Sequence, residues 1–342
     1  MNSLKVLILN KLLRVFISFF FICLVSFTII RLIPGDPVTN ILGERGASAE
    51  RILELKKHYG LDQPVLKQFQ IFITNVVQGD FGESSVSHQP VMSEFKVLWP
   101  ATFELAIIAL TWASIAGIFL GMLAAIKRNS VWDYSAVSIS TIGFAMPIFW
   151  WALICILFFS VDLQWLPVSG RIGIEYDIPY HTGFYLIDSW FSDTGLYAFL
   201  SALRHLVLPA FVLGTIPLAM ITRITRSAFI DVEKEDFIRT AKAKGLSPGK
   251  VLFKHIMKNA LPQILTTIGL SLGQLLTGAI ITETLFSWPG LGRWLIKSIE
   301  ARDYPVVQTG LFYSMLIIAL TNIIVDFGIE KLNPKMKDMK NA

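Results

Sequence analysis

The sequence predicts an all-α, polytopic membrane protein with six membrane-spanning helices. Of its 342 residues, 54% are hydrophobic and only 16% are charged, and the mean hydropathy is +0.59. Soluble domains carry about 25% charged residues, so this composition argues against a soluble enzyme. No basic stretch is interleaved with aromatic residues, so nucleic acid is not an expected partner. Membrane lipid is.

Six windows without a charged side chain approach the length of about 20 residues that a helix needs to cross a bilayer. They are residues 15–30, 105–126, 134–161, 205–222, 259–282 and 304–325. The first and fourth windows are short, but Arg14, Arg31 and Arg223 extend them because long basic side chains reach the membrane surface. Pro147 interrupts the third window and predicts a kink or an early helix end there. No small-residue cleavage site follows the first window, which favours a retained span over a signal peptide.

The distribution of basic residues predicts that both termini are cytoplasmic. The connections on the side of the termini carry 18 Lys and Arg, against 12 on the opposite side. Short basic connections stay in the cytoplasm, as the positive-inside rule states. The predicted organisation is a cytoplasmic N-terminus (1–11), spans at 12–33, 101–126, 134–161, 205–226, 259–284 and 304–328, external segments at 34–100, 162–204 and 285–303, a cytoplasmic loop at 227–258 and a cytoplasmic C-terminus (329–342). Within the first external segment, residues 49–59 have the pattern of a short amphipathic helix that ends at Gly60.

The sequence contains no recognisable catalytic, metal or ATP-binding motif. None of the five histidines is followed by Glu, as a zinc-protease motif requires. Residues 245–251 resemble a phosphate-binding loop only superficially, because three residues separate the glycines and Val251 stands in place of the magnesium-binding hydroxyl. Inside the spans, only Glu104 and Glu283 come close to forming an ion relay. This scarcity of charge favours a protein that receives its energy from a partner.

Two further patterns concern helix contacts and a cytoplasmic structure. Gly117 with Gly121, and Gly269 with Gly273, have the spacing that lets helices approach closely in lipid, either within the chain or at a dimer seam. Residues 235–244 have helix-forming composition and end at Gly245, after which Pro248 can open a second helix. Such a helix–turn–helix is either a surface that another protein binds or a solvated basic loop.

At this segment the sequence resembles the permease subunits of type I ABC importers, which depend on a binding protein. Their cytoplasmic signature is Glu-Ala-Ala, three residues, then Gly. Here Arg239-Thr240-Ala241 stands at the first three positions and Gly245 at the last. Arg in place of Glu departs from the general signature, although Arg-Thr-Ala is the usual form in the peptide/nickel branch. The resemblance implies that this helix docks in a groove of an ATPase subunit.

The resemblance extends over nearly the whole chain. Further matching segments are residues 31–37, 59–64, 79–84, 166–171, 204–209, 282–293 and 302–305. Residues 176–188 most resemble the dipeptide-transporting members, the first of the two membrane subunits. The expected function is therefore movement of dipeptides or short peptides across the bacterial cytoplasmic membrane by alternating access. Oligopeptide, nickel or haem transport by the same machine stays open.

The resemblance also implies the type I ABC importer permease fold and a set of partners. These are a homologous second permease, two cytoplasmic ATPase subunits and an external solute-binding protein. ATP and Mg are expected in the ATPases, so this chain is expected to hold no cofactor and to be no enzyme. The alternatives are a stand-alone ion-coupled carrier and a non-transporting scaffold or sensor. The carrier should show membrane-embedded charges and inverted repeats, and the sequence has no obvious signs of either. The scaffold or sensor would need no extensive cavity.

The resemblance assigns expected roles to two groups of residues. Arg239, Thr240, Ala241 and Gly245 are expected to transmit motion from the ATPase, with Gly245 providing a turn of positive φ. Six residues immediately outside spans are expected to form an outer gate or a docking surface for the binding protein: Pro34, Gly35, Asp36, Trp288, Pro289 and Gly290. The alternative is that these turns only cap and anchor helices.

Overall fold

The computed structural model describes residues 2–32 and 62–332, and these are overwhelmingly helical. The helices are α1 (Asn2–Leu32), α4 (Val65–Gln78), α5 (Val91–Ile126), α6 (Val131–Ala145), α7 (Ile148–Cys155), η1 (Ile156–Asp162), α8 (Tyr185–Asp188), η2 (Ser189–Phe191), α9 (Leu196–Glu233), α10 (Asp236–Ala243), α11 (Pro248–Lys250), η3 (Val251–Met257), α12 (Lys258–Leu285), α13 (Leu291–Glu300) and α14 (Tyr304–Leu332). Extended pairing in these residues is limited to one bridge between Glu83 and Pro90. The predicted helix at 49–59, its end at Gly60, and Pro34, Gly35 and Asp36 lie outside the described residues.

Each of the six predicted windows lies on helical structure. Within the described residues, three helices are long and apolar enough to cross a membrane: α5, α9 and the Tyr304–Val325 part of α14. Two bent pairs raise this number to five if each pair is one span, and α1 contributes a shorter apolar stretch at Val15–Ile29. The prediction of an all-α polytopic membrane protein is confirmed.

The third predicted window is broken at Pro147. Helix α6 ends at Ala145, and Met146 has an extended backbone with φ −75° and ψ 133°. A residue before proline avoids the helical region because the proline ring would clash with its backbone. Helix α7 then starts at Ile148, and the two halves are bent by 105°. The early helix end that the sequence predicts at Pro147 is therefore confirmed.

The chain divides into two compact units, which are described separately. The first comprises residues 1–100 and 290–319, among which α1, α4, α13 and most of α14 are described. Phe19 and Phe81 each pack against Phe312 of α14, with ring centroids 6.0 Å and 5.7 Å apart. The buried Asp303 carboxylate accepts hydrogen bonds from Ser84 and from the amide of Val306, in the first turn of α14. Asp303 thus joins two of the segments that carry the family resemblance, 79–84 and 302–305.

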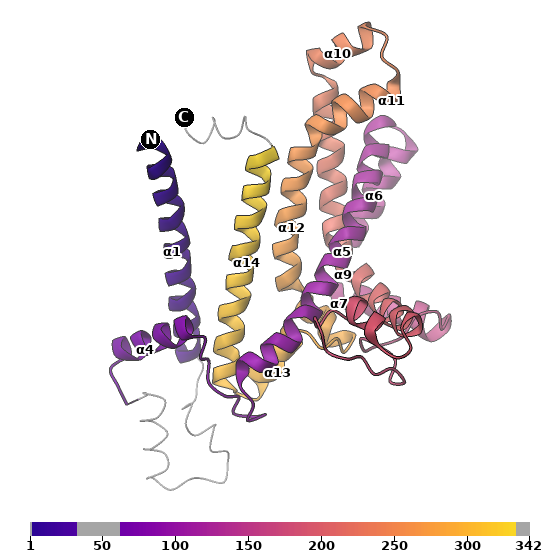
Figure 1. Ribbon diagram of the computed structural model, residues 1–342. Helices are drawn as coiled ribbons and strands as arrows, with labels where there is room; N and C mark the ends of the chain where they lie inside the picture. Colours follow the sequence, from indigo (N-terminus) through magenta and orange to yellow (C-terminus); the bar gives the residue numbers. More distant parts are fainter. Residues whose placement is uncertain (1, 33–61, 333–342) are drawn as a thin grey trace. The chain divides into compact units, whose positions relative to one another are not determined.

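The second unit comprises residues 101–289 and 320–342, and α9 is its central helix (Figure 1). Helix α9 packs against α6, α7 and α12, and 67% of its apolar window is buried. Gly117 and Gly121 of α5 lie against α9, where a Cβ atom at Gly121 would stand 2.5 Å from the carbonyl oxygen of Thr222. Gly269 similarly lies against Val325. The small residues therefore serve helix packing within the chain, which favours the first of the two readings of their spacing.

Candidate functional site

The signature residues around Gly245 lie on a helix, a glycine turn and a second helix. Helix α10 is followed by Gly245 at φ 75°, a left-handed conformation that glycine adopts without strain. The amide of Leu246 reaches back to the carbonyl of Ala241, which closes the helix end. Pro248 then occupies the first turn of α11, where its missing N–H costs nothing. The predicted helix–turn–helix is therefore present, at one end of α9 and α12 (Figure 1).

The signature residues divide between a buried and an exposed side of α10. Ile238 and Ala241 are buried, at 0% and 5% exposure, in a core that also contains Phe229 of α9, Val251 of η3 and Ile264 of α12. Arg239, Thr240 and Gly245 are exposed. Ala241 therefore holds α10 onto α9 and α12, and the others face outward. Helix α10 packs on η3, which in turn packs on α9 and α12.

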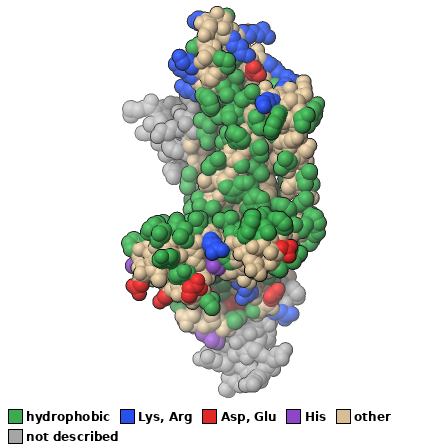
Figure 2. Space-filling model, turned by 90° about the vertical axis from the view of Figure 1, so that its right-hand side faces the viewer, with side chains coloured by type: hydrophobic (Ala, Val, Ile, Leu, Met, Phe, Trp, Pro, Cys, Tyr) green, Lys and Arg blue, Asp and Glu red, His purple; other side chains and the backbone are tan. Residues whose placement is uncertain are grey.

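The outward side of this segment combines basic and aromatic side chains. Figure 2 shows Lys and Arg gathered at this end of the second unit, beyond a band of hydrophobic side chains. The exposed pairs Lys242–Glu233 (2.9 Å) and Arg239–Asp236 (3.4 Å) hold charged groups along α10, and such surface pairs add at most about 1 kcal/mol. Phe237 and Phe253 are 43% and 62% exposed. Sequence reasoning did not single out Phe237, because one apolar residue in a polar helix gives no periodic signal.

Trp288 lies at the opposite end of α12 and is fully buried. Its indole Nε1 donates to the carbonyl of Ala101 at 2.9 Å, and its amide donates to the carbonyl of Glu283 at 2.8 Å. Pro289 and Gly290 follow directly, and α13 starts at Leu291. A side chain that is 1% exposed is held as a helix anchor and offers little surface to a partner. For Trp288 this placement supports the capping and anchoring alternative.

Glu104 and Glu283, the two acidic residues near predicted span ends, both take part in structural contacts. Glu283 is fully buried and accepts a hydrogen bond from the Thr102 hydroxyl at 2.6 Å. Glu104 forms an ion pair of 2.6 Å with Arg171, and both side chains are at most 5% exposed. Arg171 belongs to residues 162–204, which are predicted to be external and are called the external segment below. Sequence reasoning missed this pair, since 67 residues separate its members. It ties the external segment to α5.

Further hydrogen bonds fix the external segment around Arg171 and Asp188. Arg171 also donates to the carbonyl of Gly183 at 2.8 Å and lies over the Tyr185 ring at 3.8 Å. The buried Asp188 carboxylate accepts from the amides of Thr182 and Gly183 and from the Thr182 hydroxyl. Burial raises the pKa of Asp188, but these hydrogen bonds outweigh it and leave the pKa below the usual value. The turn at residues 182–183 is therefore held by Arg171 through a carbonyl and by Asp188 through amides and a hydroxyl.

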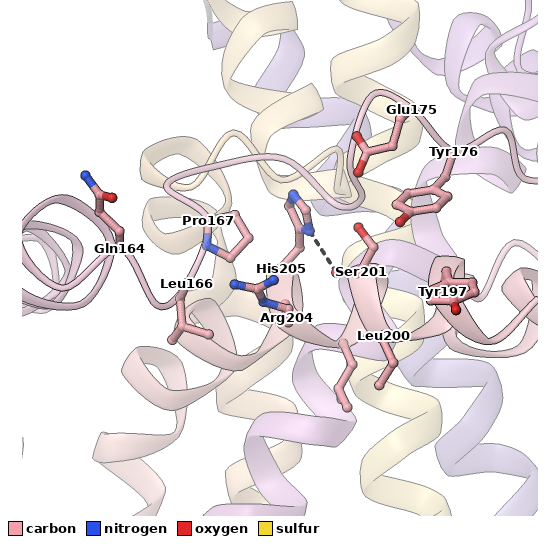
Figure 3. Close-up of a pocket in the computed structure, with 11 residues that line it drawn as sticks. Gln164, Leu166, Pro167, Glu175, Tyr176, Tyr197, Leu200, Ser201, Arg204 and His205 are labelled. Carbon is pink, nitrogen blue, oxygen red and sulfur yellow. Dashed lines mark hydrogen bonds between the residues drawn. The ribbon is translucent and has the colours of Figure 1, made fainter. Parts of the chain in front are cut away.

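A cavity of about 550 Å³ lies between the external segment and the first turns of α9 (Figure 3). Its apolar wall is formed by Leu166, Pro167, Leu200 and Leu203, and its polar wall includes Glu175, Tyr176, Tyr197, Ser201, Arg204 and His205. His205 donates from Nδ1 to the carbonyl of Ser201 at 2.8 Å, because a carbonyl only accepts. Arg204 donates to the carbonyl of Trp165 at 2.8 Å. Within the described residues, no three His, Cys, Asp or Glu side chains are placed to hold a metal ion.

Comparison with known proteins identifies the family. Residues 117–338 match the family described as "Binding-protein-dependent transport system inner membrane component", and residues 4–106 match its N-terminal companion. The chain belongs to this family. It is therefore the membrane component of a binding-protein-dependent transport system and a multi-pass protein of an inner membrane, rather than an enzyme.

Curated relatives cover almost the full length of the chain. It is 48% identical to a di/tripeptide transport system permease protein of Pseudomonas aeruginosa, over 94% of this chain and 96% of the relative. It is 45% identical to a dipeptide transport system permease protein of Escherichia coli K12, over 97% of this chain and 99% of the relative. A solved structure of the MetNI methionine ABC transporter, at 15% identity, covers 68% of this chain and 93% of its own, with a TM-score of 0.51. That likeness shows the fold alone, which is the predicted importer permease fold.

Proposed function

We propose that this permease moves dipeptides and similarly short peptides inward across the cytoplasmic membrane, driven by ATP hydrolysis in partner subunits. The assignment of dipeptides as the cargo rests on the near-full-length similarity to permease proteins named for dipeptide and di/tripeptide transport, at 45–48% identity. A glutathione transport permease of E. coli is also similar, at 37% identity over 96% of this chain. Both comparisons favour short peptides over oligopeptides, nickel or haem.

The proposed assembly contains a homologous second permease, two cytoplasmic ATPases that bind ATP and Mg, and an external solute-binding protein. Both chain termini lie in the cytoplasm in this arrangement. The excess of basic residues on that side supports it, because nine of the 30 Lys and Arg fall within residues 223–258. The same charge sits beside α10, where an acidic groove of a partner would be attracted to it.

The proposed route of coupling runs from the ATPase through α10 to α9 and α12. Arg239 and Thr240 offer polar contacts on the outward side of α10, and Phe237 adds an exposed aromatic surface. Ala241 and Ile238 transmit the displacement because they belong to one buried apolar core with residues of α9, η3 and α12. Gly245 permits the tight turn that returns the chain to α12. ATP-driven closure of the ATPases then biases a two-state arrangement of the spans.

On the external side, we propose that Pro34, Gly35 and Asp36 contribute to an outer gate or to docking of the binding protein. Pro289 and Gly290 are candidates for the same role, with Trp288 fixing their position from the core. Deletions within residues 40–90 test docking, because they remove external surface near the first span. Unchanged affinity for the binding protein after such deletions would argue against docking there.

The cargo is tested by uptake into proteoliposomes that contain the complete transporter with its binding protein outside. We expect ATP-dependent accumulation of labelled Ala-Ala, competed by unlabelled di- and tripeptides. Longer peptides, nickel and haem serve as the comparison arms. Preferred uptake of any of these three over Ala-Ala would overturn the assigned cargo while leaving the importer mechanism intact.

A further inference from the structure

The external segment of the second unit, residues 162–204, exposes many large apolar and aromatic side chains. Trp165, Ile174, Trp190, Phe191, Leu196 and Tyr197 are between 53% and 105% exposed. An apolar surface of this extent is costly in water and marks an interaction site. Figure 2 shows hydrophobic side chains on this segment that continue into the apolar band of the spans, and acidic side chains along its other edge. The segment is thus polar on one side and apolar on the side toward the bilayer.

The continuity of this apolar side with the hydrophobic band of the spans favours lipid over protein as its partner (Figure 2). Trp and Tyr are enriched where a membrane protein meets the head groups, because the rings are apolar and their N–H or O–H groups stay hydrated. Trp165, Trp190 and Tyr197 have this character and are more than half exposed. Their segment therefore suits the head-group region of a bilayer.

The cavity beside this surface presents two opposite charges that do not neutralise each other. Glu175 and Arg204 both line it, yet no ion pair within 4.0 Å joins them. One guanidinium nitrogen of Arg204 donates to the carbonyl of Trp165, and the other nitrogens make no hydrogen bond with the described residues. The amide of Gly173 donates to the Ser201 hydroxyl at 3.0 Å, which fixes the stretch that bears Glu175 above α9. Figure 3 shows the two charged groups on different sides of the cavity.

A ligand that matches this cavity carries an amine and an anionic group, attached to an apolar body. Arg204 would pair with the anion and Glu175 with the ammonium, and both contacts are charge-assisted. Leu166, Leu200 and Leu203 supply the apolar wall. A short peptide shares the amine and the anion, but a lipid also fits the apolar surface that continues from the segment into the hydrophobic band of the spans.

We propose that this cavity binds the head group of an amine-bearing phospholipid, phosphatidylethanolamine, from the outer leaflet. The phosphate lies at Arg204 and the ammonium at Glu175, while the acyl chains run along the exposed apolar side chains of the segment. The site is independent of the transported cargo, since it uses none of the residues assigned to coupling or gating.

The test measures lipid bound to the purified full transporter by native mass spectrometry. The complex is delipidated and then titrated separately with phosphatidylethanolamine, phosphatidylglycerol and Ala-Ala. The variants are Arg204→Gln and Glu175→Gln, with Asp177→Asn and Lys67→Gln as controls, since both control residues are exposed and lie outside the cavity lining. Arg204→Lys tests rescue, because it keeps the positive charge.

We expect Arg204→Gln to weaken binding of both phospholipids, by about tenfold or more, as for loss of a hydrogen bond to a charged group. Glu175→Gln should remove only the preference for phosphatidylethanolamine over phosphatidylglycerol, and both controls should bind like the wild type. Equal lipid binding by wild type, Arg204→Gln and Glu175→Gln would overturn the proposal. Saturable binding of Ala-Ala that displaces the lipid would assign the cavity to peptide instead and would equally overturn it. If Arg204→Gln does not yield intact complex, the preference lost in Glu175→Gln decides the outcome.

Discussion

The guanidinium of Arg171 and the carboxylate of Glu104 form an ion pair of 2.6 Å in which both side chains are almost wholly buried. Arg171 belongs to the external segment and Glu104 to α5. The second carboxylate oxygen of Glu104 accepts a hydrogen bond from the amide of Leu186 at 2.9 Å. This pair holds an irregular part of the external segment against α5. The cavity and the exposed aromatic side chains lie on the same segment.

Removing Arg171 should strongly destabilise the attachment of the external segment to α5. Arg171→Met leaves the Glu104 carboxylate buried without its partner, a situation that costs about 3–5 kcal/mol. The double variant Arg171→Met/Glu104→Met removes both charges and should recover part of the loss. Thermal unfolding of the purified transporter measures both. A double variant less stable than either single variant would show that the pair is not the main contact.

Gly245→Val should uncouple transport from ATP hydrolysis while the subunits still assemble. The strain arises from the backbone, because Gly245 has φ 75° and a Cβ atom there would meet no atom within 4 Å. A β-branched residue in this conformation costs about 1–3 kcal/mol, which disturbs the turn that follows α10. Gly245→Asn is the matched control, since Asn tolerates positive φ. Peptide uptake and ATPase activity are compared, and wild-type uptake by Gly245→Val would contradict the assigned role.

Gly121→Ala should destabilise the transporter although alanine favours helices. The added methyl group would stand 2.5 Å from the Thr222 carbonyl oxygen and 2.6 Å from Cβ of Thr225. Overpacking of this kind costs about 1–3 kcal/mol and exceeds the gain in helix propensity. Gly278→Ala in α12 is the control, because a Cβ atom at Gly278 would meet no packed atom within 4 Å. The order of the two unfolding temperatures decides the prediction, and a loss of stability only in Gly278→Ala would refute it.

Asp188 should make the external segment sensitive to acid. The pKa of Asp188 in the folded protein lies below that of an unfolded aspartate. Its stabilising contribution is therefore fully present above the unfolded pKa and is lost as the pH falls through the folded pKa. Asp188→Asn should therefore be less stable at pH 6 and should differ less from the wild type in strong acid. Thermal unfolding between pH 6 and pH 3 measures this difference, with the exposed Asp177→Asn as control. A difference that stays constant over the whole range would contradict the role of the carboxylate.

The spans and the coupling segment are the parts of this fold that local sequence signals predict well. Charge-free windows of membrane length, a proline break at residue 147 and a glycine after residues 236–243 are local features, and the structure contains a helix, a break and a turn at those places. Which side chains of α10 are buried and which are exposed could not be predicted from the sequence. The eight residues of this helix do not reveal which neighbours cover Ala241.

The contacts that build the external segment could not be predicted, because they join residues far apart in the chain. Arg171 reaches Glu104 across 67 positions, and Glu283 reaches Thr102 across 181. Trp288 lies next to the end of a predicted span, a position that suggested exposure. Its indole is instead buried and donates a hydrogen bond to the carbonyl of Ala101. A polar residue beside a membrane window carries no local sign of whether its partner is water, lipid or a distant side chain.

Peptide uptake by the reconstituted transporter decides whether this chain moves peptide with energy supplied by partner ATPases. Proteoliposomes containing the complete transporter are loaded with ATP, and accumulation of labelled Ala-Ala is followed with the binding protein outside. We expect accumulation that requires hydrolysable ATP and the ATPase subunits and that is insensitive to ionophores. Accumulation by this chain without the ATPases, driven by an ion gradient, would contradict it.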